Sequence, residues 1–340
     1  MKYLFIGGTG NISKYITRDL LAAGHTVYLV NRGFRNDGLT GDVHFIRADV
    51  NKEPEKLAEA ISDMTFDAVA DFIVFNKEQA ERDFNLFNGK CRQYLVFSTA
   101  SVYQKPLSCP VITESTPLSN PYSPYSKNKI EMEAYLNEMY RQHGFPVTII
   151  RPSHTYGDHF LPLTLECAEG GWPTIKRILE GKPVIVHGDG LTLWTVTHSS
   201  DFAKGFIGLL NNIHAIGETY HITSDECVTW NQIFEVMGEA CGKKPILYHV
   251  ASELLGDFSD GKYLWGTIGD KGNSVIFDNS KLKRVVPGFT CTVRMDQGVK
   301  ESVEYLLAHP EMQKENPEFD AWCDKVIDTL EEAKKRFHEA

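Results

Sequence analysis

The sequence lacks the cysteine pairs of a metal ribbon and has no long hydrophobic run. Its seven cysteines are scattered, and no two of them form a Cys-x-x-Cys pair. This pattern argues against a disulfide framework and a zinc ribbon, and it favours reduced thiols in the cytoplasm. The first ten residues, MKYLFIGGTG, hold only a short apolar run before the glycines. Such a run is too short for a signal peptide or a membrane span, so we expect a cytoplasmic protein without a membrane segment.

Positive charge is also in short supply. The chain has 35 Lys and Arg against 45 Asp and Glu, which gives a net charge of −10. That balance disfavours a large phosphate-binding surface for nucleic acid. Internal repeats and low-complexity segments are missing too. What is present is an ordinary globular composition, 42% hydrophobic and 24% charged over 340 residues, which is enough for a large core and two lobes.

Short apolar segments alternate with helical patterns through the first half of the chain. The expected strands read YLFIGG, TVYLVNRG, VHFIRADV, FDAVADFIVF, QYLVFSTAS and FPVTIIRP, and helical patterns lie between most of them. Strands that are apolar throughout and alternate with helices indicate a parallel sheet covered on both faces. After residue 152 the loops lengthen and become richer in Gly, Pro and His, which indicates a second lobe.

Three glycines separate the first strand from the first helix. Gly7, Gly8 and Gly10 stand where the pyrophosphate of a dinucleotide meets backbone N–H groups at a helix N-terminus. Glycine is needed there because a Cβ would hold the phosphates away. Ser13 replaces the third glycine of the usual fingerprint, and its small side chain still allows close helix–strand packing. We therefore predict an α/β fold with a Rossmann doubly wound parallel sheet and a smaller, interleaved C-terminal α/β lobe for the substrate.

The two lobes are expected to interleave along the chain. The dinucleotide-binding domain should comprise residues 1–152 and 195–224, because DFAKGFIGLLNN and ETYHIT read as one more helix and strand of the sheet. The substrate-binding lobe should comprise residues 153–194 and 225–340. Within that lobe, Thr229 and Gln232 form a possible capping box at the start of a helix.

The end of the second strand selects between the two dinucleotides. An acidic residue there would bind the adenosine ribose and repel a 2′-phosphate, but this sequence has Asn31 and Arg32. A guanidinium can pair with a phosphate bidentately. We therefore expect NADP, with NAD as the alternative. Asp49, which follows the third strand, should lie near the adenine.

Tyr125 begins a helix and is followed by two lysines. Side chains three or four residues apart share a helix face, so Lys129 should lie beside Tyr125 while Lys127 points elsewhere. A neighbouring ammonium favours the phenolate, which would make Tyr125 a usable general base near neutral pH. A half-buried tyrosine with a solvated lysine is the alternative reading of this spacing.

Hydroxyl groups gather at the end of the strand QYLVFSTAS, where open α/β sheets place their ligands. They belong to Ser98, Thr99, Ser101 and Tyr103. Any one of them could instead cap the following turn.

From Met1 to about residue 300 the chain resembles the extended short-chain dehydrogenase/reductases, in an atypical branch of the NAD-dependent epimerase/dehydratase family. The motifs that carry this resemblance are, in order, GGTGNIS, FSTASVY, YSKNK, IRPSHTYG, HGDGLTLWTVTHSSDFA and YHITSDE. The resemblance implies that Thr99 binds the reacting hydroxyl, that Tyr125 moves its proton, and that Lys129 holds the nicotinamide ribose and lowers the tyrosine pKa. The expected cofactor contacts are Gly7, Gly8, Thr9, Gly10, Asn11, Ile12, Asn31, Arg32, Asp49, Val50, Asp71, Phe72, Ser98, Tyr125, Lys129, Pro152 and His154.

Several positions depart from the family pattern. The dehydratases of this group have an Asp-Glu pair after the catalytic threonine, but Ala100 and Ser101 stand there, so dehydration is not expected. The arginine that grips the pyrophosphate of a nucleotide sugar is replaced by Trp194. Two family asparagines are replaced by His154 and His221. These histidines have no carboxylate or cysteine at short spacing, so we expect no metal site.

Trp194 suggests a substrate smaller than a nucleotide sugar. An indole cannot replace a bidentate guanidinium, but it packs well on the C–H face of a sugar ring. Alternatively, Trp194 is a core residue, and Arg294 or Arg177 meets a pyrophosphate. Arg294 could also hold an anionic group of the substrate. The expected substrate contacts are Thr99, Ser101, Tyr103, His154, Trp194 and Arg294.

The leading hypothesis is thus an NAD(P)-dependent oxidoreductase or epimerase that acts on a carbinol carbon of a sugar-like small molecule. A nucleotide-sugar 4-epimerase is the alternative within the same class. An RNA-binding protein similar to the chloroplast stem-loop-binding branch of the superfamily is the alternative of another class, although the acidic charge and the complete Thr99, Tyr125 and Lys129 set make nucleic acid an unlikely partner. A homodimer is left open.

Overall fold

The computed structural model describes residues 1–33 and 38–339, and the chain divides into two compact units. Unit 1 comprises Met1–Thr155, Thr197–Asp225 and Phe277–Thr292. Unit 2 comprises Tyr156–Val196, Glu226–Ile276 and Val293–Ala340. The sequence predicts that residues 277–292 belong to the substrate lobe. This segment belongs to unit 1 because Leu282 and Phe289 pack in the same hydrophobic cluster as the central sheet.

Unit 1 is built on a single parallel sheet of seven strands. They are β1 (Lys2–Ile6), β2 (Thr26–Asn31), β3 (Val43–Arg47), β4 (Ala68–Asp71), β5 (Tyr94–Phe97), β7 (Val147–Pro152) and β12 (Thr219–Ile222). Their order is β12-β7-β5-β4-β1-β2-β3, and every neighbouring pair is parallel. The order reverses between β1 and β4, so a crevice is expected at the carboxyl ends of these strands. The predicted doubly wound sheet is therefore confirmed.

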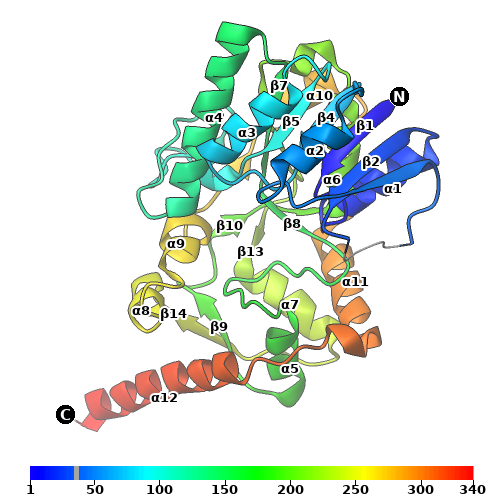
Figure 1. The fold of residues 1–340 in the computed structure, drawn as a ribbon. Helices are drawn as coiled ribbons and strands as arrows, with labels where there is room; N and C mark the ends of the chain where they lie inside the picture. Colours follow the sequence, from blue (N-terminus) through cyan, green and yellow to red (C-terminus); the bar gives the residue numbers. More distant parts are fainter. Residues whose placement is uncertain (34–37, 340) are drawn as a thin grey trace. The chain divides into compact units, whose positions relative to one another are not determined.

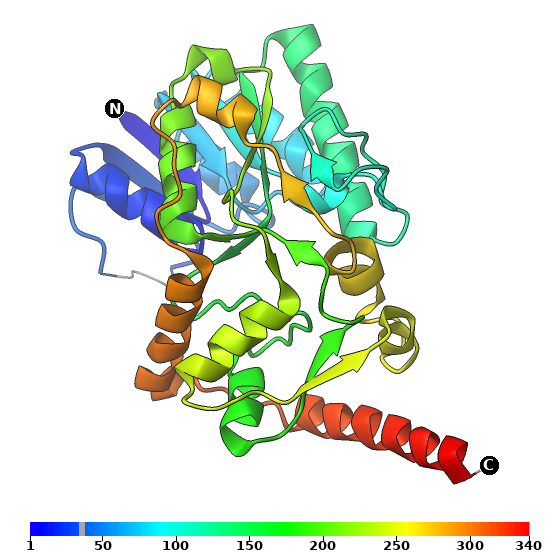
Figure 2. The same ribbon diagram turned by 180° about the vertical axis from the view of Figure 1, so that it is seen from behind.

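Helices cover both faces of this sheet, as Figures 1 and 2 show from opposite sides. One face carries α1 (Ser13–Ala22), α6 (Ser199–Leu209) and α10 (Ser280–Val285). The other carries α2 (Pro54–Ala60), α3 (Lys77–Phe87) and α4 (Pro124–His143). The alternation of side chains along a strand produces the two layers.

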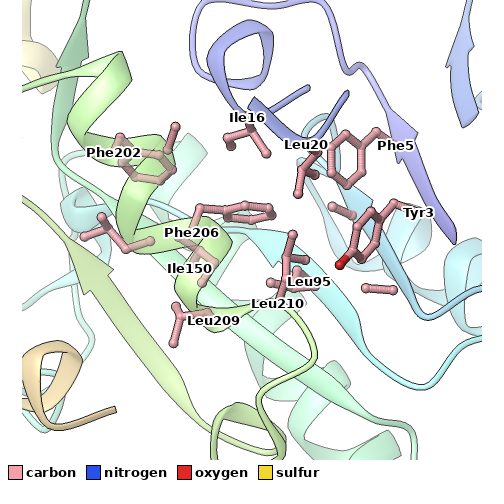
Figure 3. Packing of buried hydrophobic residues seen from close by; sticks show 14 of the residues in the cluster. Tyr3, Phe5, Ile16, Leu20, Leu95, Ile150, Phe202, Phe206, Leu209 and Leu210 are labelled. Atoms are coloured by element: carbon pink, nitrogen blue, oxygen red, sulfur yellow. The ribbon is translucent and has the colours of Figure 1, made fainter. Parts of the chain in front are cut away.

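Strand β1 illustrates that alternation. Tyr3 and Phe5 enter the cluster with Phe206 of α6, which Figure 3 shows, while Leu4 and Ile6 enter the cluster on the opposite face. Because every one of these β1 side chains is buried, the strand reads as a continuous apolar run.

Unit 2 contains two small sheets and six α-helices among its described residues. Strands β9 (Val184–His187) and β14 (Leu247–Val250) are parallel, and β10 (Leu193–Trp194) and β13 (Val228–Thr229) are antiparallel. The helices are α5 (Trp172–Glu180), α7 (Trp230–Ala240), α8 (Ser252–Asp257), α9 (Leu264–Gly266), α11 (Met295–Ala308) and α12 (Pro317–Glu339), which are labelled in Figure 1. The predicted capping box at the start of α7 is present: Thr229 and Gln232 exchange hydrogen bonds.

Short elements complete the chain. They are β6 (Val111–Ile112), β8 (His154–Tyr156), β11 (Val196–His198), β15 (Ile276–Phe277), the 3₁₀ turns Ala100–Val102, Ile213–Ala215 and Pro310–Met312, and a π-helical turn at Thr267–Lys271. Within the described residues, no helix combines the length and apolarity needed to cross a membrane.

Candidate active site

The glycine turn joins β1 to α1 and depends on a serine. Gly7 has a φ of +82°, and a Cβ on Gly8 would come within 2.4 Å of Leu29 Cδ2, so neither position accepts a larger residue without a shift. Ser13 Oγ donates to the Gly7 carbonyl at 2.7 Å and accepts the Gly10 N–H at 2.8 Å. The serine that replaces the third glycine therefore holds the turn closed.

The turn is also tied to the segment after β7. Asn11 Nδ2 donates to the Thr155 carbonyl at 3.1 Å, which brings Pro152 and His154 to the same end of the sheet. Both residues are half-buried, as are Thr9 and Ile12. The structure thus gathers the two predicted groups of cofactor contacts, although the Asn11 amide is already engaged by the backbone.

Two arginines flank the end of β2. Asn31 Oδ1 accepts the Gly33 N–H at 2.8 Å, whereas Asn31 Nδ2 is buried and has no hydrogen-bond partner among the described residues. Arg32 is exposed. Arg47 stands opposite Asn31 on β3, and a Cβ on Gly33 would lie 3.2 Å from its Nε. Arg47 is not among the predicted cofactor residues, and its only signal in the sequence is its place at the end of the third strand.

Three predicted cofactor residues have their side chains engaged elsewhere. Asp49 Oδ1 accepts the Asn51 N–H at 3.1 Å. Val50 is a buried core residue, and the Phe72 ring stacks on Phe97 with their centroids 4.4 Å apart. Only the main chains of Val50 and Phe72 remain to contact a cofactor, because their side chains fill the core on opposite faces of the sheet.

Helix α4 presents Tyr125 and Lys129 on one face. Lys129 is 1% exposed, and its Nζ donates to the Val74 carbonyl at 2.5 Å and to the Phe97 carbonyl at 2.6 Å. The same Nζ lies 5.6 Å from the centroid of the Tyr125 ring. Lys127 is exposed, and Tyr125 is half-buried. The helix spacing therefore distinguished the two lysines correctly.

Burial makes the Lys129 ammonium easier to deprotonate. It lowers the pKa of Lys129 from 10.5 to about 8, and the nearby carboxylates of Asp71 and Glu133 oppose this shift. Since the folded chain releases the proton more readily than the unfolded chain, charging Lys129 destabilises the fold below about pH 8. This destabilisation decreases as the pH rises from about 8 towards 10.5, the ordinary pKa of a lysine.

A chain of hydroxyl groups links β5 to α4. Thr99 Oγ1 lies 3.0 Å from Ser101 Oγ, which lies 2.8 Å from Ser126 Oγ. Thr99 is half-buried, whereas Ser101 and Ser126 are buried. Ser101 was predicted to contact the substrate, but both of its hydroxyl contacts are internal. It orients Thr99, and sequence reasoning had not singled out Ser126.

Tyr103 and His221 form a buried pair. The Tyr103 hydroxyl lies 3.2 Å from His221 Nδ1, and His221 Nε2 lies 2.7 Å from the Asp278 carbonyl. Burial raises the pKa of Tyr103 and lowers that of His221. Both side chains are fully covered. The expectation that Tyr103 contacts a substrate is therefore not supported by its position, because it packs instead against the Arg151 guanidinium.

The unit 1 residues fit a bound dinucleotide. Ser98 Oγ, at the carboxyl end of β5, is 3% exposed and has no partner among the described residues, and Asn31 Nδ2 is in the same condition at the end of β2. Buried polar groups are normally hydrogen-bonded, so two unpartnered groups at the carboxyl ends of β5 and β2 indicate hydrogen bonds that a ligand would make. No group of three or more His, Cys, Asp or Glu side chains that could hold a metal occurs among the described residues.

The predicted substrate residues of unit 2 are occupied by other contacts. Trp194 is 3% exposed and lies 5.8 Å from Trp230 between ring centroids, which is the environment of a core residue. Arg294 is 69% exposed and makes a bidentate pair with Asp296. Trp194 thus follows the alternative reading of the sequence, in which the indole belongs to the core.

Arg177, the other arginine considered for a pyrophosphate, is buried in unit 2. It pairs with Asp320 and, at 2.7 Å, with Asp324 on α12. Its guanidinium anchors α12 to α5 and is not available to a ligand without breaking these pairs.

The order of the parallel strands and the glycine turn after β1 are those of the Rossmann fold class. The chain belongs to the NAD dependent epimerase/dehydratase family, whose sequence profile matches residues 3–223. The expected family is therefore confirmed, and its members include NAD-dependent epimerases, dehydratases and reductases.

Individual relatives are distant. The 2′-dehydrokanamycin reductase of Streptomyces kanamyceticus is 24% identical over 85% of this chain and 80% of its own length. The chloroplast stem-loop binding protein of 41 kDa b from Arabidopsis thaliana is 29% identical over 71% of this chain and 62% of its own length. The structure of UDP-glucuronic acid 4-epimerase from Bacillus cereus in complex with UDP-glucuronic acid and NAD is similar in fold, with a TM-score of 0.73 and 20% identity over 91% of this chain and 99% of that one.

The two lysines of α4 provide a first prediction. Lys129→Ala should weaken dinucleotide binding and reduce turnover, because it removes a buried charge that lies beside Tyr125. Lys127→Ala is the matched control: the same substitution two residues away, on the exposed side of the helix, should change neither quantity. Fluorescence titration with a reduced dinucleotide measures the affinity. A larger loss for Lys127→Ala would refute the helix-face argument.

Proposed function

We propose that this protein is an NAD(P)-dependent oxidoreductase or epimerase that acts on a carbinol carbon of a sugar-like substrate. The observation that carries the proposal is the convergence of Tyr125, Lys129 and Thr99. Lys129 is held by the carbonyl of Phe97, two residues before Thr99, and its ammonium lies beside the Tyr125 ring. Helix α4 thus contributes an acid/base group, Tyr125, and a positive charge, Lys129. The hydroxyl of Thr99 follows β5, and the hydrogen bond from Lys129 to the Phe97 carbonyl joins the two elements.

Each side chain has a distinct role in the proposed reaction. The Tyr125 phenolate, favoured by the Lys129 ammonium, accepts the proton of the substrate hydroxyl and later returns it. Thr99 Oγ1, oriented by Ser101, binds the same substrate oxygen. When bound, the nicotinamide accepts or donates the hydride. Gly7, Gly10 and the first turn of α1 would hold the pyrophosphate of this cofactor.

The direction of the reaction depends on the fate of the keto product. If it stays in the site and is reduced on its other face, the outcome is epimerisation; if it leaves, the protein is a dehydrogenase or reductase. A tightly held cofactor favours the first outcome. Ala100 and Ser101 occupy the positions of the acidic pair that the dehydratases use to expel water, so dehydration is not part of the proposal.

A substrate without a nucleoside diphosphate is the second part of the proposal. Two phosphates entering a protein site need paired cations, because a buried unpaired charge is costly. Trp194 stands in the place of the usual arginine and is a core residue, Arg177 is committed to two aspartates, and Arg294 is paired with Asp296. A reductase that acts on 2′-dehydrokanamycin is among the relatives, which is consistent with such a substrate.

One observation favours the alternative, a nucleotide-sugar 4-epimerase. Lys271 in unit 2 is 6% exposed, and its Nζ contacts Glu166 at 3.2 Å, a carboxylate that is itself largely exposed. Thr192 Oγ1, two residues before Trp194, donates to the Lys271 carbonyl at 2.9 Å. If Glu166 moved away, this ammonium could meet one phosphate. Solved structures of similar fold bind UDP-sugars, so this alternative needs a direct test.

For the cofactor, we propose NADP, with NAD as the alternative. The end of β2 has a neutral Asn31, whose Nδ2 lacks a partner among the described residues, and two guanidinium groups close by, Arg32 and Arg47. An adenosine 2′-phosphate would pair with these cations, whereas no acidic side chain follows β2 directly to bind the ribose of NAD.

A phenylalanine at position 125 tests the acid/base role. Tyr125→Phe removes only the hydroxyl, so dinucleotide binding should persist while turnover falls at least ~100-fold, the usual scale for a positioned acid/base. Binding is measured by calorimetry and turnover by absorbance of the reduced nicotinamide with a panel of sugars and sugar acids. Full activity of Tyr125→Phe would exclude this tyrosine as the general acid/base.

Alanine at the two arginines tests the cofactor preference. Arg32→Ala and Arg47→Ala should each weaken NADP binding by roughly 1–3 kcal/mol, the range for a charge-assisted contact, and leave NAD almost unchanged. Parallel calorimetric titrations of both dinucleotides provide the comparison. Tighter binding of NAD than of NADP by the unmodified protein would overturn the preference, and equal losses for both would show that these arginines do not recognise the 2′-phosphate.

Titration with UDP tests the size of the substrate. The cofactor-loaded protein should bind UDP and UDP-glucose no more tightly than it binds plain sugars and sugar acids, because its unit 2 arginines are already paired. Thermal shift and calorimetry measure this. Micromolar binding of UDP alone, lost in Lys271→Met, would restore the nucleotide-sugar epimerase and identify its phosphate contact.

A further inference from the structure

A buried cluster of charged side chains lies beneath the cofactor-facing edge of unit 1. Asp71, at the end of β4, and Asp83, on α3, are both fully buried. Arg82 NH2 contacts Asp71 Oδ2 at 3.1 Å and Asp83 Oδ1 at 2.6 Å. The Tyr94 hydroxyl of β5 donates to Asp83 Oδ2 at 2.5 Å. The sequence analysis placed Asp71 among the cofactor contacts, but its carboxylate is sealed inside this cluster.

Asp71 anchors the loop that follows β4. Its Oδ1 accepts the Ile73 N–H at 2.7 Å. The next residue, Val74, provides one of the two carbonyls that hold Lys129. On the other side of the loop, a Cβ on Gly7 would meet Ile73 Cγ2 at 3.0 Å, so the loop also packs against the glycine turn. One carboxylate therefore fixes a segment that touches two parts of the site.

The count of charges distinguishes Asp71 from the other carboxylate near Lys129. Glu133 faces the ammonium from the next turn of α4, but it makes a bidentate pair with Arg151 of β7, at 2.9 and 2.5 Å, and that pair is neutral. Asp71 and Asp83 together share the single guanidinium of Arg82. When these groups are ionised, the cluster keeps one negative charge in excess, and the Asp71 carboxylate interacts electrostatically with the Lys129 ammonium.

We propose that Asp71 is a positioning residue for Lys129: its carboxylate, held by Arg82, anchors the loop whose Val74 carbonyl accepts a hydrogen bond from the buried ammonium, and its negative charge favours the protonated lysine. The inference rests on the proposed function, since Lys129 matters for activity only if the site binds a dinucleotide. One direction agrees with it: Asp71 is the carboxylate that most strongly opposes the lowering of the Lys129 pKa. Burial, and then Asp83, raise the pKa of Asp71, while Arg82 lowers it, so this carboxyl gains its charge at a higher pH than it would in water.

The first test is the pH dependence of cofactor binding. Asp71→Asn keeps an acceptor for the Ile73 N–H and removes the charge. The pH at which reduced-dinucleotide affinity begins to fall on the alkaline side should move down by at least about half a unit, because an ammonium without its counter-charge loses its proton sooner. Asp83→Asn also removes the excess negative charge, because it leaves Asp71 and Arg82 as a neutral pair, but it keeps the Asp71 carboxylate on the Ile73 N–H. It should therefore move the same pH down by less than Asp71→Asn does.

The two variants separate positioning from folding. If the role of the cluster were purely structural, both variants would have lower unfolding midpoints. The alkaline pH at which dinucleotide affinity begins to fall would then be unchanged in both. If dinucleotide affinity began to fall at the same alkaline pH in Asp71→Asn, Asp83→Asn and the unmodified protein, the proposal would be overturned, whatever the loss of stability.

A second test needs no cofactor and holds even if the single variant folds poorly. Urea midpoints of the unliganded protein are compared for Asp71→Asn, Lys129→Met and the double variant. If the two charges face each other, Asp71→Asn should lower the midpoint less when residue 129 is already Met. An equal drop in both backgrounds would show that Asp71 acts on the loop alone. A smaller drop in the Lys129→Met background, found together with no dinucleotide binding, would instead refute the proposed function and leave the interaction of Asp71 with Lys129 supported.

Discussion

The buried ammonium of Lys129 is the contact on which the rest of the site depends. A charge removed from water is tolerated only when hydrogen bonds and counter-charges replace its hydration. Here the replacements are the carbonyls of Val74, in the loop that follows β4, and of Phe97, the last residue of β5. Satisfying one lysine therefore fixes α4 against two neighbouring strands, and it does so at the edge of the sheet where a doubly wound fold binds its ligand.

The same requirement explains why so many polar groups are buried around this edge. Glu133 with Arg151, and Asp71 with Arg82 and Asp83, are pairs or clusters in which every charged group has an opposite charge in contact. The hydroxyls of Thr99, Ser101 and Ser126 form a hydrogen-bonded chain from the residues after β5 to α4. Ser98 Oγ and Asn31 Nδ2 differ from these groups, because neither has a hydrogen-bond partner among the described residues. We infer that these two positions are where the protein leaves hydrogen bonds for a ligand to make.

Unit 2 shows the opposite use of charge. Its buried arginine, Arg177, joins α5 to α12 through Asp320 and Asp324, and Arg294 closes onto Asp296 at the start of α11. These two arginines are paired with aspartates of the same unit, so they are not available to bind an anionic ligand. The proposal of a substrate without a pyrophosphate rests on this commitment, and Lys271, whose partner Glu166 is largely exposed, is the residue through which it could fail.

The sequence by itself determined the parallel sheet, the glycine turn, the family and the difference between Lys127 and Lys129. The sheet, the turn and the lysine faces follow from local rules: strand and helix periodicity, the φ that only glycine adopts readily, and the repeat of 3.6 residues that sets helix faces. The family follows from the resemblance of the motifs. Tertiary structure alone decided which side chains are covered. Trp194 and Tyr103 look like ligand contacts in a motif, yet both are buried against other side chains, and Asp71 lies under the site instead of in it. Arg47 and Ser126 gained their places for the same reason: a neighbour across a sheet or between a strand and a helix is set by packing of distant segments, which no spacing along the chain encodes.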